Sequence, residues 1–317
     1  MFNKILVPID NSPIAEQALP TAIDLARRSG TPLELVYVHR TEPAGGYSDA
    51  PWNAGRRSSQ QSYLDGVADE VRRESGVSVH TSFSSGDPIP AICTQAHRLG
   101  ADLIVMTSHA RTGISRAWLG SVADGVVRQS CVPVLLLHPQ PLNRAPAARA
   151  FKRVLVPLDG SAEAEMVLDA ACTLAGKDGA RVILLEIVAP IPLMVVDTTI
   201  GYAAPLSIPD VDATQEVVEL AKQRLETTAR RVAAEGCEVE QHVVASGFAG
   251  QAILAAAREH MADAIAMTTT GRGASRLIVG SVADAVLRGT SSPLLLYRPR
   301  ASGAVRAPSE ESSVARA

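Results

Sequence analysis

Apolar residues in this chain fall into short continuous runs, separated by longer stretches in which they recur with a helical period. In the first half the runs predict strands at Ile5–Ile9, Leu33–His39, Val77–Phe83, Asp102–Thr107 and Val132–Leu137. The stretches between them predict helices at Pro13–Ser29, Gln60–Ser75, Pro88–Leu99 and Ser121–Gln129. Continuous Val, Ile and Leu runs are typical of strands that are covered on both faces. The pattern therefore predicts a doubly wound α/β domain, a five-stranded parallel sheet flanked by helices.

The first predicted helix has recognisable start and stop signals. Ser12 is a suitable N-cap, Pro13 fits the first helical position, and Gly30 fits the stop. Pro20 lies inside the stretch, and we expect it to kink the helix there. A polar loop that contains Trp52–Ser59 is expected before the second helix.

The whole pattern is written twice. "KILVPIDNS" at Lys4–Ser12 returns as "RVLVPLDGS" at Arg153–Ser161, and "ADLIVMTSHAR" at Ala101–Arg111 returns as "ADAIAMTTTGR" at Ala262–Arg272. A stretch that begins "GSVAD" follows Ala101–Arg111 in the first copy and Ala262–Arg272 in the second. Self-similarity on this scale indicates two tandem copies of one domain.

The repeats divide the chain into four parts. We expect one domain at 1–138, a linker at 139–150 rich in proline and basic residues, a second domain at 151–300, and a disordered tail at 301–317. The second copy is longer because of an apolar insertion, Ala189–Ala213, which we interpret as a flap over its own domain or a contact with a protein partner.

Composition and charge narrow the classes of function. The net charge of −3 gives no basic field for nucleic acid or an anionic membrane, and apolar runs stay below the roughly 18 residues of a membrane span. The N-terminus enters a strand pattern almost at once, so a cytoplasmic location is expected. The histidines look isolated, and neither a catalytic triad nor a metal-ligand spacing emerges. The sequence therefore favours a binding module over an enzyme.

The repeated motifs resemble the universal stress protein family in its tandem two-domain form. The resemblance rests on "VPID" and "VPLD", the two "GSVAD" stretches, and "VPVLLL" and "SPLLLY" at the end of each copy. It implies the strand order 3-2-1-4-5, with the first and fourth strands adjacent at the switch point where open α/β sheets bind ligands. In the nucleotide-binding branch of that family, a Gly-x2-Gly-x9-Gly-Ser/Thr loop after the fourth strand holds the phosphates of ATP.

Carried over residue by residue, the resemblance implies two nucleotide sites, with ATP as ligand and Mg²⁺ as its companion ion. The implied site residues are Pro8, Asp10, Val38, Met106, Thr107, Ala110, Arg111, Gly120, Ser121 and Val122 in the first domain and Pro157, Asp159, Ile187, Met267, Thr268, Gly271, Gly280, Ser281 and Val282 in the second.

Two kinds of site residue have a structural reading beside the functional one. Asp10 and Asp159 can accept a ribose hydroxyl or organise the turn after the strand, and one carboxylate could do both. Ser121 and Ser281 are expected as helix N-caps, where the exposed amides also form an anion site.

The loop departs from the family pattern differently in each copy. Thr107, Ala110 and Gly120 keep the family spacing, although only one of the three is glycine, and alanine disfavours a positive φ. In the second copy Gly271 and Gly280 are glycines, but the interval between them is one residue short. Backbone donors survive a substitution better than a deletion, so the first domain is expected to bind ATP better. A degenerate interaction scaffold and a slow ATPase remain alternatives.

The last strand of each copy is apolar and would lie at a sheet edge under the family order. A bare apolar edge invites aggregation, and members of the family that this chain resembles pair these edges across a two-fold axis. The resemblance therefore implies that Val132–Leu137 and Pro293–Tyr297 pair antiparallel around a pseudo-two-fold axis within one chain. A homodimer of whole chains is compatible with this arrangement.

Overall fold

The computed structural model describes residues 1–40, 50–108, 119–141, 143, 147–176, 179–197, 204–269 and 279–299. Side chains are described in these ranges except at 50–53, 194–197 and 204–208. The predicted tail at 301–317 lies outside the described residues.

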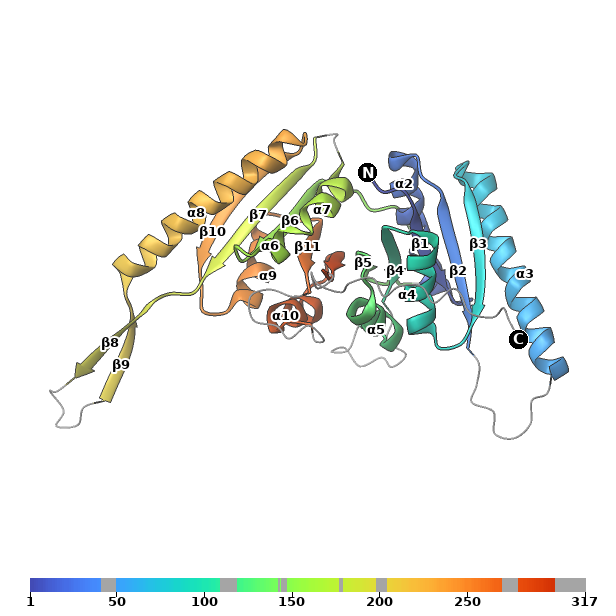
Figure 1. Ribbon diagram of the computed structural model, residues 1–317, viewed down its shortest axis with the longest axis horizontal. Helices are drawn as coiled ribbons and strands as arrows, with labels where there is room; N and C mark the ends of the chain where they lie inside the picture. Colours follow the sequence, from blue (N-terminus) through green and yellow to red (C-terminus); the bar gives the residue numbers. More distant parts are fainter. Residues whose placement is uncertain are drawn as a thin grey trace, which may run out of the picture.

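The strands of both copies form one ten-stranded sheet (Figure 1). Its strands in the first copy are β1 (Ile5–Ile9), β2 (Leu33–His39), β3 (Val79–Ser85), β4 (Leu103–Thr107) and β5 (Val134–Leu137). Those in the second are β6 (Arg153–Leu158), β7 (Arg181–Val188), β10 (Glu238–Ala245), β11 (Ala264–Thr268) and β12 (Leu294–Tyr297). The order is β10-β7-β6-β11-β12-β5-β4-β1-β2-β3, so each half has the predicted order 3-2-1-4-5 and the predicted fold class is confirmed.

The helices cover the sheet in two layers. They are α1 (Pro13–Glu16), α2 (Leu19–Ser29), α3 (Ala50–Ser75), α4 (Pro88–Leu99) and α5 (Ser121–Gln129), then α6 (Ala162–Glu165), α7 (Leu168–Ala175), α8 (Val211–Ala234), α9 (Ala249–Glu259) and α10 (Ser281–Gly289). One apolar core packs α2, α3, α7 and α8 against one face, and a second packs α4, α5, α9 and α10 against the other. Each core contains residues of both copies, so the two domains share their hydrophobic interior.

The two halves meet through their last strands, as predicted. β5 and β12 pair antiparallel, with Leu135 opposite Leu295 and Leu136 opposite Leu294. All four side chains are buried. β5 and β12 would each be an unpaired edge strand in a single domain, and here they pair with each other and join the two domains.

Charged side chains bridge the same junction on the side of α5 and α10. Arg128 pairs with Asp124 of its own helix at 2.8 Å and approaches Asp284 of the other domain at 3.7 Å. Arg288 also pairs with Asp284, and its hydrogen bond, helped by the charge of Arg128, lowers the pKa of that carboxyl. The junction is thus apolar inside the sheet and ionic on one flank.

The local signals around the first helix are largely confirmed. The Ser12 side chain caps α1 by accepting from the Ala15 amide, Pro13 is its first residue, and Gly30 ends α2 with a φ of 64°. Pro20 does not kink one helix as expected, because the helix divides into α1 and α2 and Pro20 falls in the first turn of the second. A proline is tolerated there since the amide it lacks would have no helical partner.

Several boundaries differ from the sequence-based expectation. Trp52–Ser59 was expected in a loop, but this stretch belongs to α3, which begins ten residues before Gln60. Residues 54–59 are all exposed, so they carry no apolar periodicity that could indicate a helix. The third strand begins at Val79 and the fifth at Val134, each two residues later than predicted.

The fourth strand begins after its aspartate in both copies. Asp102 accepts hydrogen bonds from the Asn3 and Lys4 amides, and Asp263 accepts them from the Lys152 and Arg153 amides. These carboxylates tie the start of the fourth strand to the start of the first, so they lie just outside the ladder.

The insertion in the second copy forms a β-hairpin. It consists of β8 (Pro192–Asp197) and β9 (Ala204–Pro209), paired antiparallel, and leads into α8. Figure 1 shows the hairpin extending away from the ten-stranded sheet, at the end where β7 finishes. This direction does not match a flap lying over its own sheet, and contact with a partner remains a proposal.

Within the described part of the chain, none of the helices combines the length and the apolar character needed to cross a membrane.

Candidate functional site

In each half-sheet the predicted site residues that the structure describes gather at the edge where the parallel strands of that half present their carboxyl ends. β1 lies between β2 and β4, and β6 lies between β7 and β11, so the first and fourth strands of each copy are neighbours. Pro8, Val38, Met106 and Thr107 lie on the first-copy strands, and Pro157, Ile187, Met267 and Thr268 lie on the second-copy strands. Asp10 and Asp159 follow β1 and β6 directly. The topology therefore creates the switch point that the resemblance implies.

The two aspartates organise the turn after the first strand. Asp10 Oδ1 accepts hydrogen bonds from the Ser12 amide at 3.2 Å and the Ser12 hydroxyl at 2.6 Å, and Asp159 Oδ1 accepts from the Ser161 amide at 3.0 Å. The residue between the aspartate and the serine has a left-handed backbone conformation in both copies: Asn11 has a φ of 63° and Gly160 a φ of 76°. Asparagine and glycine are the residues that tolerate this conformation best, which explains "DNS" and "DGS". The turn-organising role is present in the structure, and the ribose role is a proposal.

The helices that follow the fourth strands begin at Ser121 and Ser281, as predicted, but the N-cap of each is the residue before. Gly120 and Gly280 are the N-caps of α5 and α10, and neither helix has a side-chain cap hydrogen bond. Ser121 and Ser281, expected as caps, are instead the first helical residues and are exposed, with Val122 and Val282 half-buried behind them. The correction matters for binding, because a glycine N-cap has no side chain that could occupy the first amides of these two helices.

Buried hydroxyls without partners lie at the same edge. Thr107 and Ser108 at the end of β4, and Thr269 at the end of β11, are each less than about one-tenth exposed, and their hydroxyls have no hydrogen-bond partner among the residues that the structure describes. The Gly280 amide donates to the Thr269 carbonyl at 2.8 Å, which brings the start of α10 beside the end of β11. Unsatisfied buried polar atoms are costly, so this edge offers donors and acceptors to a polar ligand.

The middle of both phosphate loops lies outside the described residues. This applies to the implied site residues Ala110, Arg111 and Gly271. Leu119, directly before the N-cap of α5, packs against the core on that face.

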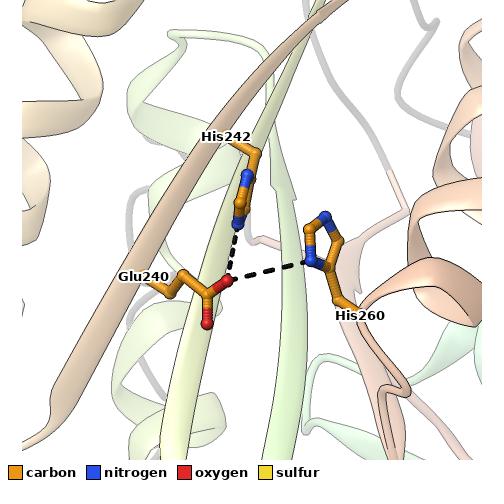
Figure 2. Close-up of side chains that lie close together, drawn as sticks. All are labelled: Glu240, His242 and His260. Carbon is orange, nitrogen blue, oxygen red and sulfur yellow. Dashed lines mark hydrogen bonds and ion pairs between the residues drawn. The ribbon is translucent and has the colours of Figure 1, made fainter.

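One group of titratable residues was missed in the sequence. Contrary to the expectation that the histidines are isolated, His242 and His260 lie beside Glu240, whose Oε1 is 2.8 Å from His242 Nε2 and 3.8 Å from His260 Nδ1 (Figure 2). The hydrogen bond to His242, supported by Arg181 and Arg153, lowers the pKa of Glu240. The sequence signal was the spacing of Glu240 and His242, which places both on one face of a strand.

Comparisons with known proteins agree with the geometry. The family described as "Universal stress protein family" matches residues 1–138 and 150–298. Universal stress protein YxiE of Bacillus subtilis is 30% identical over 157 residues, which is 44% of this chain and 100% of that protein. Universal stress protein MJ0531 of Methanocaldococcus jannaschii is 29% identical over 140 residues, 43% of this chain and 82% of that protein.

Similarity of fold extends over nearly the whole chain. The crystal structure of a universal stress protein from Archaeoglobus fulgidus superimposes with a TM-score of 0.68, covers 93% of this chain and 98% of its own, and is 24% identical. Two matched segments, two mirrored half-sheets and the repeated switch point lead to one conclusion. This chain belongs to the universal stress protein family and carries two of its domains in tandem.

Proposed function

We propose that this protein is a cytoplasmic stress-response protein that binds ATP at the carboxyl edge of its first half-sheet and acts by regulation, not by catalysis. The observation that carries the proposal is the pair of buried hydroxyls of Thr107 and Ser108 at the end of β4, which have no partner among the described residues. In the same half, α5 begins after a glycine N-cap. Hydroxyl groups and free helix amides are the donors that phosphate oxygens accept from.

The residues present fit an adenine nucleotide in outline. Asp10 is exposed past β1, where a carboxylate can accept a ribose hydroxyl, and Val38 is half-buried near the end of β2, where an apolar side chain can contact a base. The start of α5, at Gly120 and Ser121, would hold phosphate. Mg²⁺, bound together with the nucleotide, would neutralise part of the triphosphate charge.

The first half is the better candidate of the two. It keeps the loop spacing of the family, whereas the second is one residue short. Among the described residues it also has two buried hydroxyls without a partner at the strand end, Thr107 and Ser108, whereas the second half has one there, Thr269. We therefore assign the principal ATP site to the first domain.

A matched pair of substitutions tests the assignment in the full chain. Ser121→Glu puts a carboxylate at the first position of α5, where it stabilises the helix dipole but repels a phosphate. We expect calorimetric titration with Mg²⁺ and ATP to show at least about tenfold weaker binding, equivalent to about 1.4 kcal/mol. Ser281→Glu makes the same change at the same position of α10, and we expect it to alter the affinity by less than about twofold.

If Ser281→Glu weakens ATP binding and Ser121→Glu does not, the principal site lies in the second domain. If neither variant binds differently from the parent protein, phosphate does not lie at these helix starts. Complete absence of ATP binding in the parent chain would favour the scaffold alternative, in which the projecting β8–β9 hairpin is the feature best suited to contact a protein partner.

A further inference from the structure

The group formed by Glu240, His242 and His260 lies on the edge strand of the second half-sheet. Glu240 and His242 are the third and fifth residues of β10 (Glu238–Ala245), and His260 is the C-cap of α9, which returns to the amino ends of the second-half strands before β11. Parallel strands place their amino ends together, so within the second half the group is separate from Asp159 and the start of α10. Asp10 and the start of α5 belong to the other half-sheet, and β1 lies far from β10 in the strand order.

The three side chains converge on a small volume. One ligand atom from each lies within 4.8 Å of the other two, and the imidazole rings of His242 and His260 have centroids 4.0 Å apart. Figure 2 shows both rings directed at the Glu240 carboxylate, one from the same strand and one from the end of a helix. Ligands of one tetrahedral or octahedral ion are about 3–3.5 Å apart when each bond is about 2.0–2.2 Å long. Small side-chain rotations bring the observed separations into that range.

The two oxygens of the Glu240 carboxylate have different partners. Oε2 forms ion pairs with Arg181 at 3.0 Å and with Arg153 at 3.7 Å, while Oε1 faces the two imidazoles. The Arg153 side chain also donates to the backbone carbonyl of His260 at 2.6 Å, which fixes the end of α9 beside the sheet. Groups of this kind, which orient the ligands from behind, are a regular part of protein metal sites. All three candidate ligands are half-buried, so an ion can enter from solvent and keep water on its remaining positions.

We propose that Glu240, His242 and His260 bind one divalent transition-metal ion of the borderline class, represented by Zn²⁺. Two imidazoles and one carboxylate are a ligand set found in open zinc sites. In the metal-bound form His242 offers the Nε2 lone pair and carries its proton on Nδ1. The ion would fasten the end of α9 to the edge strand β10.

The first copy supplies an internal control. Strand register places His80 and Ser82 where the second copy has Glu240 and His242. The sequence repeat places Leu99 where it has His260. Only one of these three can ligate a metal through its side chain, so the site is specific to the second domain. His80 is exposed, and its replacement removes a histidine without touching the proposed site.

The test is calorimetric titration of the full, reduced chain with zinc chloride in a buffer that does not chelate metals. We expect one ion per chain at this site, and we expect His242→Ala and His260→Ala each to lower the affinity by about 100-fold or more. His80→Ala should change it by less than twofold. Titration with Co²⁺ gives a second readout, in which nitrogen and oxygen ligation produces no thiolate charge-transfer band.

Three results would overturn the proposal. They are absence of Zn²⁺ binding in the folded parent chain, binding that is equal in the parent and both histidine variants, and a Co²⁺ spectrum with a thiolate band that His242→Ala leaves intact. Circular dichroism of each variant shows whether the fold is retained. Glu240→Gln, which keeps the shape of the side chain, replaces any variant that unfolds.

Discussion

Leu135→Glu should unfold or separate the two domains at neutral pH. Leu135 is 0% exposed, lies opposite Leu295 in the antiparallel junction, and belongs to the core shared by both copies. An ionised carboxylate at this position has no positive partner in the strand pairing, and burying it costs several kcal/mol in addition to the roughly 2–3 kcal/mol of lost leucine burial. The sum is comparable to the total stability of a typical domain, about 5–15 kcal/mol.

The prediction can be separated from a general effect of added charge. Leu220→Glu makes the same replacement on α8, where the side chain is 54% exposed, and should change the free energy of unfolding by less than about 0.5 kcal/mol. Burial raises the pKa of a carboxyl group, so the penalty at position 135 should be greatest at neutral pH and shrink as the pH falls towards about 4. Urea denaturation and size-exclusion chromatography measure both variants, and equal midpoints would show that β5 and β12 do not join the domains.

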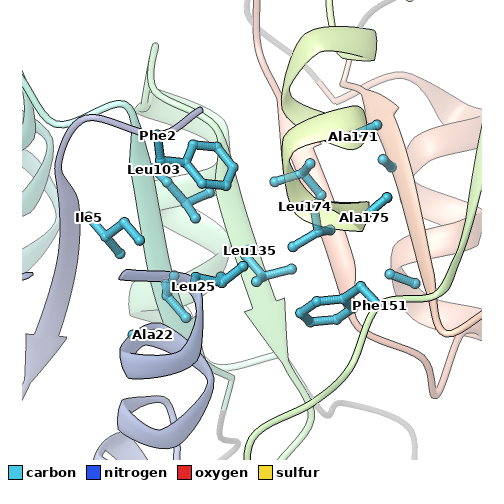
Figure 3. Close-up of a cluster of buried hydrophobic side chains, with 14 of the residues drawn as sticks. Phe2, Ile5, Ala22, Leu25, Leu103, Leu135, Phe151, Ala171, Leu174 and Ala175 are labelled. Atoms are coloured by element: carbon cyan, nitrogen blue, oxygen red, sulfur yellow. The ribbon is translucent and has the colours of Figure 1, made fainter. Parts of the chain in front are cut away.

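Phe151→Ala should be the most damaging single truncation near the linker, with a loss of about 3–5 kcal/mol in the free energy of unfolding. Phe151 is 1% exposed and stands just before β6. Figure 3 shows its ring in the same cluster as Leu135 of the first copy and Leu174 of the second. Removing the ring leaves a cavity that three elements border, and rigid strands cannot close it fully.

An exposed phenylalanine provides the control. Phe248, the N-cap residue of α9, is 72% exposed, and Phe248→Ala should cost less than about 0.5 kcal/mol by the same urea denaturation. If the two alanine variants unfold at the same denaturant concentration, the linker end does not belong to the shared core.

The sequence predicted the elements whose residues repeat or carry a local signal. Four elements have the predicted bounds: Ile5–Ile9, Leu33–His39, Pro88–Leu99 and Ser121–Gln129. Buried strands and amphipathic helices have a regular spacing of apolar residues, which is visible in the sequence. Pairing of the last strands followed from the strand order and edge pairing that the family resemblance implies, together with the physical argument that a bare apolar edge invites aggregation.

Other features depend on information that a local pattern does not contain. The start of α3 is exposed on all sides, so its polar residues read as a loop. The bounds of α5 were predicted correctly, but its N-cap is Gly120 and not Ser121, because serine matches the preferred cap chemistry and glycine gives no comparable signal. Apolar residues of Ala189–Ala213 indicated a structured insertion, but a hairpin directed away from the sheet needed the three-dimensional structure.

The histidine group shows the same limit at a candidate site. Glu240 and His242 are two residues apart, which is visible in the sequence, but His260 joins them only because α9 carries the chain back to the amino edge of the sheet. The distance between His260 and the two β10 residues depends on the length of α9 and on the strand order together, and a local sequence pattern contains neither. The turn-organising role of Asp10 could be predicted from the sequence, because Asp10 and Ser12 are only two residues apart.

The central claim is that the carboxyl edge of the first half-sheet binds ATP. Equilibrium dialysis of the full chain against Mg²⁺ and ATP tests it most directly. We expect saturable binding of about one ATP per chain, which Ser121→Glu reduces strongly and Ser281→Glu leaves in place. Absence of saturable binding up to about 1 mM ATP, a standard free energy of about −4.1 kcal/mol, would contradict it.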